Sequence, residues 1–167
     1  MENSNIDLLK VTSQEDVFST AVLASAIWKQ HYTPIIGIEQ VNYMLDKFQS
    51  ETAINDQIKN GFEYFLAVAD GPIGYLSLKT EKDTLFISKI YLVKSERGKG
   101  YGKNMMNFAK TYAKQKKLEK LRLTVNKYNL LSIEAYEKMG FTKKRAVVFD
   151  IGNGYIMDDY EMELTLD

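Results

Sequence analysis

The chain has 167 residues, of which 45% are hydrophobic, and this is enough for one well-packed domain over residues 1–167 but not for two. Lys and Arg together number 22, and so do Asp and Glu, so no net charge attracts nucleic acid or an acidic membrane surface. The sequence contains no Cys and one His, which excludes disulfides, thiolate nucleophiles, zinc–sulfur sites and histidine metal clusters. We therefore expect a single domain and no metal.

The amino-terminal sequence MENSNIDLLKV lacks the basic start and unbroken apolar core of a signal peptide. No apolar run approaches the roughly 20 residues that span a bilayer. We expect a soluble, cytoplasmic protein that does not bind membranes.

The first half of the chain is predicted to form a strand, two or three helices and three more strands. NIDLLKV (5–11) is a strand candidate, and the capping-box spacing of Thr12 and Glu15 predicts a helix over 13–30 that HYTPIIG ends. A second helix is expected over 38–50 and a short third piece over 52–61. FEYFLAVA, IGYLSLKT and TLFISKIYLV then predict three strands joined by tight turns.

The second half is predicted to alternate helices and strands. A helix over 103–117 is followed by the strand KLRLTV, a short helix over 129–139 and two closing antiparallel strands, FTKKRAVVFDI and GYIMDDYEMELTL. The short connection into KLRLTV implies a parallel crossover. The order β-α-α-β-β-β-α-β-α-β-β predicts an α/β fold with a mixed sheet and helices on both faces.

The stretch VKSERGKGYGKNM (93–105) joins a predicted strand to a predicted helix and concentrates glycines and cations. The first N–H groups of a helix have no intrahelical acceptor and carry partial positive charge, and glycines let a ligand approach them closely. The stretch therefore predicts a phosphate cradle. A Walker loop does not fit, because Arg97 and Asn104 stand where it needs Gly and Ser or Thr. A dinucleotide fingerprint does not fit the glycine spacing either.

What remains is Arg-x-x-Gly-x-Gly at Arg97, Gly100 and Gly102, and with it the sequence resembles the GNAT-superfamily N-acetyltransferases. A later segment, LRLTVNKYNLLSIEAYEKMGF, matches that family's strand, Asn and helix ending in Tyr-x-x-x-Gly-Phe. The resemblance is firm over 62–141, and the ending IGNGYIMDDYEMEL is similar to that of many small bacterial members. It implies a mostly antiparallel sheet of six to seven strands and acetyl-CoA as co-substrate, with no metal.

The resemblance also implies where coenzyme A binds. The fourth strand would pair with the pantetheine arm, and the loop amides would hold the pyrophosphate, although Lys94 and Lys99 are equally well explained as solvated surface cations. The implied coenzyme A contacts are Ile90, Tyr91, Leu92, Arg97, Gly98, Lys99, Gly100, Tyr101, Gly102, Lys103, Asn129 and Tyr136.

Tyr136 is the general acid that the resemblance implies for the departing thiolate. Asn129, Ile133 and Tyr136 have i, i+4 and i+7 spacing, so they share one helix face. Reference pKa values of about 10 for Tyr and about 8.5 for a thiol make the transfer uphill by only about 2 kcal/mol. The alternative is a core aromatic residue with a satisfied hydroxyl.

The acceptor side is less defined. Many relatives carry a Glu on the fourth strand as base, but the matching position here is Ser88, which predicts a water relay or a base from another element. His31, Tyr32, Glu39 and Tyr43 lie in and after the loop between the early helices, which forms the acceptor wall in similar proteins. His31 is a candidate base, although a structural histidine beside Tyr32 fits equally well.

Three functions follow in order of preference. The first is acetyl transfer by direct attack of an amine, either of a small molecule such as a polyamine or of a protein N-terminus. The second is a non-catalytic acyl-CoA-binding or regulatory module on the same fold, which the missing carboxylate favours. The third, nucleic-acid binding by the cations of 94–117, is disfavoured by the zero net charge. Exposed sheet edges are compatible with a homodimer.

Overall fold

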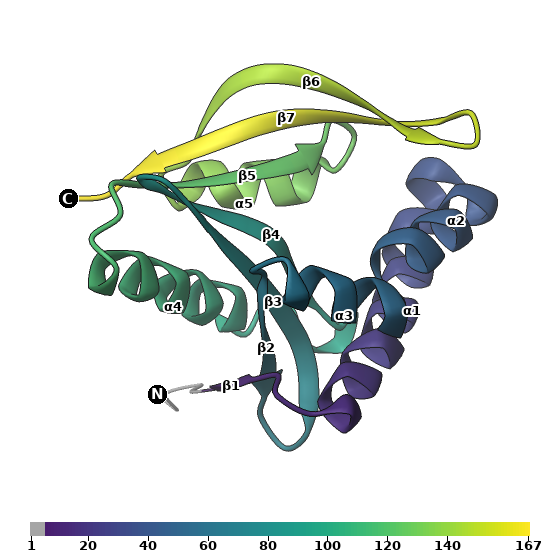
Figure 1. Ribbon diagram of the computed structural model, residues 1–167. Coiled ribbons are helices and arrows are strands. Elements are labelled where there is room, and N and C mark those ends of the chain that lie inside the picture. The colour runs from purple at the N-terminus through teal and green to yellow at the C-terminus, as the bar shows by residue number, and fades with distance from the viewer. Residues whose placement is uncertain (1–5) are drawn as a thin grey trace.

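A computed structural model describes residues 6–167; residues 1–5 of the amino-terminal segment considered above for a signal peptide, which include the first residue of the strand predicted over 5–11, lie outside it. Seven strands and five α-helices form a layered α/β structure (Figure 1). The elements are β1 (Asp7–Lys10), α1 (Gln14–Ile36), α2 (Ile38–Phe48), α3 (Glu51–Lys59), β2 (Glu63–Val68), β3 (Pro72–Glu81), β4 (Thr84–Leu92), a 3-10 turn (Lys94–Glu96), α4 (Tyr101–Gln115), β5 (Lys120–Asn126), α5 (Leu130–Lys138), β6 (Thr142–Gly152) and β7 (Tyr155–Thr165).

The strands form one sheet in the order β1-β2-β3-β4-β5-β7-β6. Every described pair is antiparallel except β4 with β5, which is parallel and joined by α4 as a crossover. The predicted fold class and element order are confirmed, with α3 as a separate helix between α2 and β2. No helix within residues 6–167 is long and apolar enough to cross a membrane.

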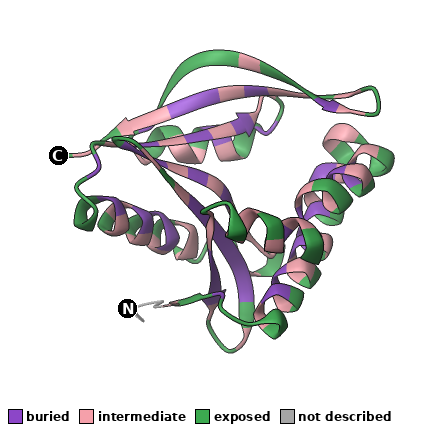
Figure 2. Ribbon diagram, in the orientation of Figure 1, coloured by how far each residue is buried: buried purple, intermediate pink, exposed green. Residues whose placement is uncertain are grey.

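Alternating side chains divide the core between the two faces of the sheet. In β2, Phe65 and Ala67 pack on the face covered by α4 and α5, whereas Tyr64 and Leu66 pack on the face covered by α1 and α3. Figure 2 shows α4 turning its buried side toward the sheet and its exposed side outward. A third cluster joins α1 and α2 to Ile151 near the β6–β7 turn.

Helix α1 differs from its prediction at both ends. Its capping box is made by Ser13 and Asp16, one residue later than predicted, with the Asp16 amide donating to the Ser13 hydroxyl over 3.1 Å. The helix also continues through Pro34 to Ile36. Buried aromatic packing of Trp28 and Tyr32 keeps this last part helical despite the proline, whose ring interrupts the hydrogen bonds of one turn.

Candidate active site

The site begins where β4 and β5 separate. They pair over only three positions, from Thr84 opposite Lys120 to Phe86 opposite Arg122, although β4 continues to Leu92. Beyond that point both strands line one cavity of about 750 Å³. The edge of β4 that faces β5 therefore presents backbone groups to the cavity instead of to a neighbouring strand.

A β-bulge at Ser88 sets which side chains of β4 face each layer. Ile87 lies opposite Leu78 and Lys89 lies opposite Ser77, so Ser88 is the extra residue. The bulge places Ile87 and Lys89 on opposite faces, whereas regular alternation would place them on the same face. Ser88 lines the cavity and brings no carboxylate to it.

The glycine-rich loop forms one end of the site. Gly100 precedes α4 with φ 85°, a left-handed conformation that glycine adopts at little cost, and no side chain caps the helix. None of the hydrogen bonds within residues 6–167 uses the backbone N–H groups of 98–103. These amides at the positive end of a 15-residue helix suit a diphosphate.

Arg97 connects this loop to both β4 and α1. Its Nε and Nη2 donate to the Leu92 carbonyl at 3.2 and 3.1 Å, and its Nη1 lies 3.4 Å from His31 Nδ1. Lys99, by contrast, forms an exposed ion pair with Glu96. Arg97 and Gly102 line the cavity, while the side chains of Lys99, Tyr101 and Lys103 lie outside its lining, as do Gly98 and Gly100.

Helix α5 brings its predicted residues to the cavity wall. Asn129 is buried at the start of the helix and donates from Nδ2 to the Tyr32 hydroxyl over 3.3 Å. Tyr136 lines the same cavity, and burial raises the pKa of its hydroxyl far above the ordinary value, with Tyr32 acting in the same direction. The hydroxyl therefore stays protonated at neutral pH, and full transfer of its proton costs more than the sequence-based 2 kcal/mol.

Aromatic rings form another part of the cavity wall. Trp28 and Tyr32 stack with ring centroids 4.3 Å apart, and Tyr91 meets Trp28 edge-on at 5.7 Å. His31 packs edge-on against Tyr32, and burial followed by the charge of Arg97 lowers the pKa of its imidazole. A cation that entered here would meet aromatic faces and a neutral histidine.

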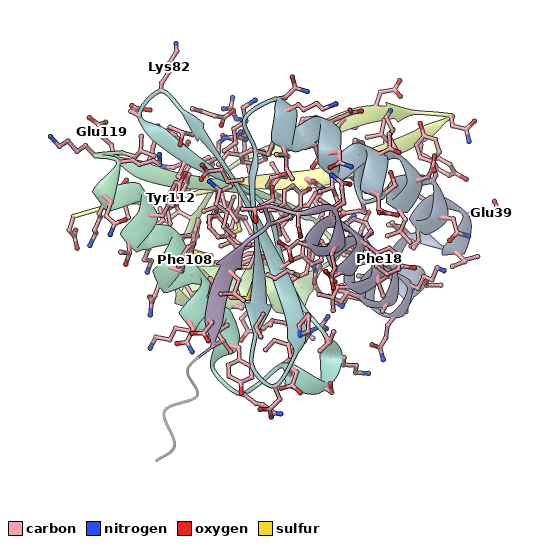
Figure 3. All side chains as sticks on the ribbon, turned by 60° about the horizontal axis from the view of Figure 1, so that its bottom comes forward. Phe18, Glu39, Lys82, Phe108, Tyr112 and Glu119 are labelled. Carbon is pink, nitrogen blue, oxygen red and sulfur yellow. The ribbon has the colours of Figure 1, made fainter. Side chains whose placement is uncertain are left out.

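The predicted acceptor residues are only partly brought together. His31 and Tyr32 line the cavity. Glu39 is exposed at the outer edge of the molecule (Figure 3), and the Tyr43 hydroxyl donates to the Ile151 carbonyl over 2.7 Å instead of facing the cavity. Tyr43 thus ties α2 to the β6–β7 hairpin.

Two buried ionisable residues that the sequence analysis did not identify also line the cavity. Lys89 is 6% exposed, and its Nζ donates to the Phe48 carbonyl, to Gln57 Oε1 and to the Tyr64 hydroxyl. Burial lowers the pKa of its ammonium to about 7. A lysine inside the apolar run TLFISKIYLV was the available signal, but its direction depends on the bulge.

The second is Asp159, which is 3% exposed on β7 opposite Asn126 of β5. The pKa of its carboxyl is raised to about 6, mainly by burial and also by the charge of Asp158, against the opposing charge of Lys127. Two adjacent aspartates in a strand gave no indication of which one is buried. Asp159 and Tyr136 therefore approach one cavity from different elements.

Comparisons with known proteins agree with this architecture. The model of the acetyltransferase (GNAT) family matches residues 27–141. A curated relative, the spermidine N(1)-acetyltransferase of Thermoplasma acidophilum, is 26% identical over 143 residues, which cover 82% of this chain and 88% of the relative.

Solved structures show the same fold. The PaiA N-acetyltransferase of Thermoplasma acidophilum in complex with coenzyme A has a TM-score of 0.82 at 24% identity and covers 97% of this chain and 99% of its own. A GCN5-related N-acetyltransferase from Rhodopseudomonas palustris has a TM-score of 0.83 at 20% identity, with 99% of both chains covered.

Proposed function

Because this chain belongs to the acetyltransferase (GNAT) family, it is an N-acetyltransferase, and we propose that it transfers acetyl from acetyl-CoA to a primary amine of a small polyamine. The observation that carries this proposal is the cavity between β4 and β5. It has anion-binding amides beside one end and a buried carboxylate among aromatic rings in its wall.

Coenzyme A fits the residues at the loop end. The N–H groups of 98–103 and the guanidinium of Arg97 would hold the pyrophosphate, since each is a charged or dipolar donor without a competing acid. The free edge of β4 around 90–92 would bind the amides of the pantetheine arm. The thioester of bound acetyl-CoA supplies the activated acyl group.

The cavity wall supports a cationic acceptor. Trp28, Tyr32 and Tyr91 present aromatic rings, and Asp159 supplies negative charge in a place shielded from water. The curated relative acts on spermidine by its name, which agrees with this chemistry. A protein N-terminus carries one such charge, whereas a polyamine carries several along an apolar chain.

Direct attack within a ternary complex is the mechanism that we infer. The sequence has no Cys that could form a thioester intermediate on the enzyme, which supports attack of the amine on the acetyl group of the co-substrate itself. Tyr136 holds its proton at neutral pH and donates it to the sulfur as the C–S bond breaks. Asn129 donates a hydrogen bond to the Tyr32 hydroxyl and so holds the N-terminus of α5 beside the cavity.

An acetyl-CoA consumption screen tests the proposal. The panel contains spermidine, spermine, putrescine, an aminoglycoside and a short peptide with a free N-terminus, and mass spectrometry identifies the product. We expect acetylated polyamine and little acetylated peptide. Preferred acetylation of the peptide would refute the acceptor, and binding of coenzyme A without acetylation of any amine would favour the non-catalytic alternative.

A further inference from the structure

Asp159 holds a negative charge in the cavity without a cationic partner. The residue is only 3% exposed, and it lines the cavity between β5 and the early helices. The nearby Lys127 ammonium lies 2.7 Å from Asp158 instead, and no ion pair within residues 6–167 includes Asp159. A buried carboxylate without a counter-ion is costly to maintain, so its position suggests a ligand that carries positive charge.

Asp159 also shares the cavity with Asn129 and Tyr136, to which the resemblance assigned contacts with coenzyme A. It stands opposite Asn126, the last residue of β5, just before the turn into α5. Its charge raises the pKa of Tyr32, after the larger effect of burial, and the Tyr32 hydroxyl accepts from Asn129. Tyr32 in turn raises the pKa of Tyr136, after the larger effect of burial. Asp159 and the proposed acid thus line one cavity, and both interact electrostatically with Tyr32.

We propose that Asp159 is the catalytic base that accepts a proton from the ammonium group of the acceptor, in place of the carboxylate that Ser88 does not provide. The inference rests on the proposed acetyl transfer and deepens it. It assigns the base to β7, the strand beside β5, and not to β4.

The proton balance of the step is complete. Asp159 takes one proton from the ammonium group, and the neutral nitrogen then forms a C–N bond to the thioester carbonyl carbon as the C–S bond breaks. Tyr136 gives its proton to the sulfur and regains one from the nitrogen. Asp159 releases its proton to solvent, so the products are an acetamide, a thiol and one proton. Burial of the ammonium in the cavity lowers its pKa and eases the first transfer.

The pH dependence follows from the groups that face Asp159. These are Tyr32 from α1, Lys127 from the turn after β5, and Asp158 from β7 itself. With a pKa of about 6, the carboxyl is mostly ionised at pH 7 and becomes protonated below pH 6. A base must be ionised to act, so kcat/KM falls as pH decreases through this value.

Asp158→Asn provides a matched control on the same strand. Both variants are assayed with spermidine from pH 5 to 9. In Asp159→Asn we expect kcat to fall about 100-fold and the acidic limb of kcat/KM to disappear. In Asp158→Asn the limb should move to lower pH, because a charge that raises the pKa of Asp159 is lost. An acidic limb retained in Asp159→Asn, or lost in His31→Gln, would overturn the proposal.

Binding gives a second readout that does not need turnover. Spermidine is titrated into the enzyme without acetyl-CoA at pH 6 in two buffers of different ionisation heat. The wild type should release about half a proton per bound ammonium, because the ion pair displaces the proton of Asp159. Asp159→Asn should release none while binding coenzyme A normally. Equal proton release would refute the role of Asp159, whereas a wild type that binds spermidine but acetylates no amine would refute the proposed function.

Discussion

Lys89 is held beneath the α2–α3 junction by three oxygen acceptors, and no carboxylate pairs with it among residues 6–167. Its three ammonium hydrogens are all used, so it has no donor left for a ligand. Lys89 therefore joins α2 and α3 to β4 and supports the part of the cavity wall that it lines. The cost of this position is the desolvation of a charge, which the hydrogen bonds offset in part.

The pH dependence of stability should reveal Lys89. The pKa of its ammonium is about 7 in the folded protein and 10.5 in an unperturbed lysine, so between these pH values the unfolded chain binds the extra proton. Unfolding then takes up a proton, and the free energy of unfolding rises with pH by at most about 1.4 kcal/mol per unit. Lys89→Met should lose this rise between pH 7 and 9, as measured by urea denaturation.

Lys82→Met is the control for this measurement, because Lys82 points to solvent at the β3–β4 turn (Figure 3). It should follow the wild type at every pH. If Lys89→Met also followed the wild type, the ammonium of Lys89 would have an ordinary pKa in the folded state.

Tyr136→Phe separates proton donation from binding. The substitution keeps the ring that packs near Phe141 and removes the hydroxyl proton. We expect kcat to decrease by about 100-fold or more, the usual size of a general-acid contribution. Calorimetry should show the affinity for coenzyme A changed by less than about twofold. Unchanged turnover would leave Tyr136 with a packing role alone.

At the scale of elements, α2 closes the cavity by bonding to the β6–β7 hairpin. Gln40 Nε2 donates to the Ile156 carbonyl over 2.8 Å, and Tyr43 and Lys47 both donate to the Ile151 carbonyl. Figure 1 shows the tip of this hairpin reaching over α2. Gly152 permits the approach, since a Cβ there would lie 2.7 Å from the Tyr43 hydroxyl oxygen.

Tyr43→Phe should loosen this closure. Loss of one hydrogen bond costs about 1 kcal/mol and weakens the wall on the acceptor side only. We expect a higher KM for the amine, an unchanged affinity for coenzyme A, and faster hydrogen exchange at residues 151–157. Tyr128→Phe, at a side chain that is 68% exposed, should change none of these. A matching rise in both KM values would place Tyr43 elsewhere in the mechanism.

The sequence predicts the order of the elements well, because each strand and helix has its own hydrophobic period. The ends of α1 were missed, since Trp28 and Tyr32 keep the helix intact past Pro34 only through tertiary packing. The acceptor side was the least predictable. The side of the sheet that Lys89 faces depends on the Ser88 bulge, and the place of Asp159 depends on β7 pairing with β5.

At the scale of the whole molecule, the proposed coenzyme site lies where two parts of the sheet meet. Strands β1–β4 and β5–β7 share only the three residue pairs between β4 and β5. A ligand that contacts both parts should stabilise the entire fold. Acetyl-CoA at 100 times its Kd should add about 2.7 kcal/mol to the free energy of unfolding.

A thermal melt measures this effect. For a chain of this size, such stabilisation raises Tm by about 5 to 10 °C. Adenosine 3′,5′-bisphosphate, which has no pantetheine arm, is the control ligand. At an equal multiple of its own Kd it would stabilise the fold by the same free energy, so both ligands are compared at equal concentration. We expect the smaller ligand to give the smaller shift because it lacks the pantetheine arm. Equal shifts would mean that the arm makes no net favourable contact with β4.

Because β4 and β5 pair over only three positions, the rest of β4 has room beside it for an extended segment from another molecule. The arm of the proposed co-substrate has two amide groups and would occupy this place, so that each catalytic cycle completes the sheet and then breaks it again. Departure of the spent thiol would thus resemble the removal of an edge strand. Turnover would then be limited by how readily the coenzyme, which acts as a temporary strand, dissociates from β4.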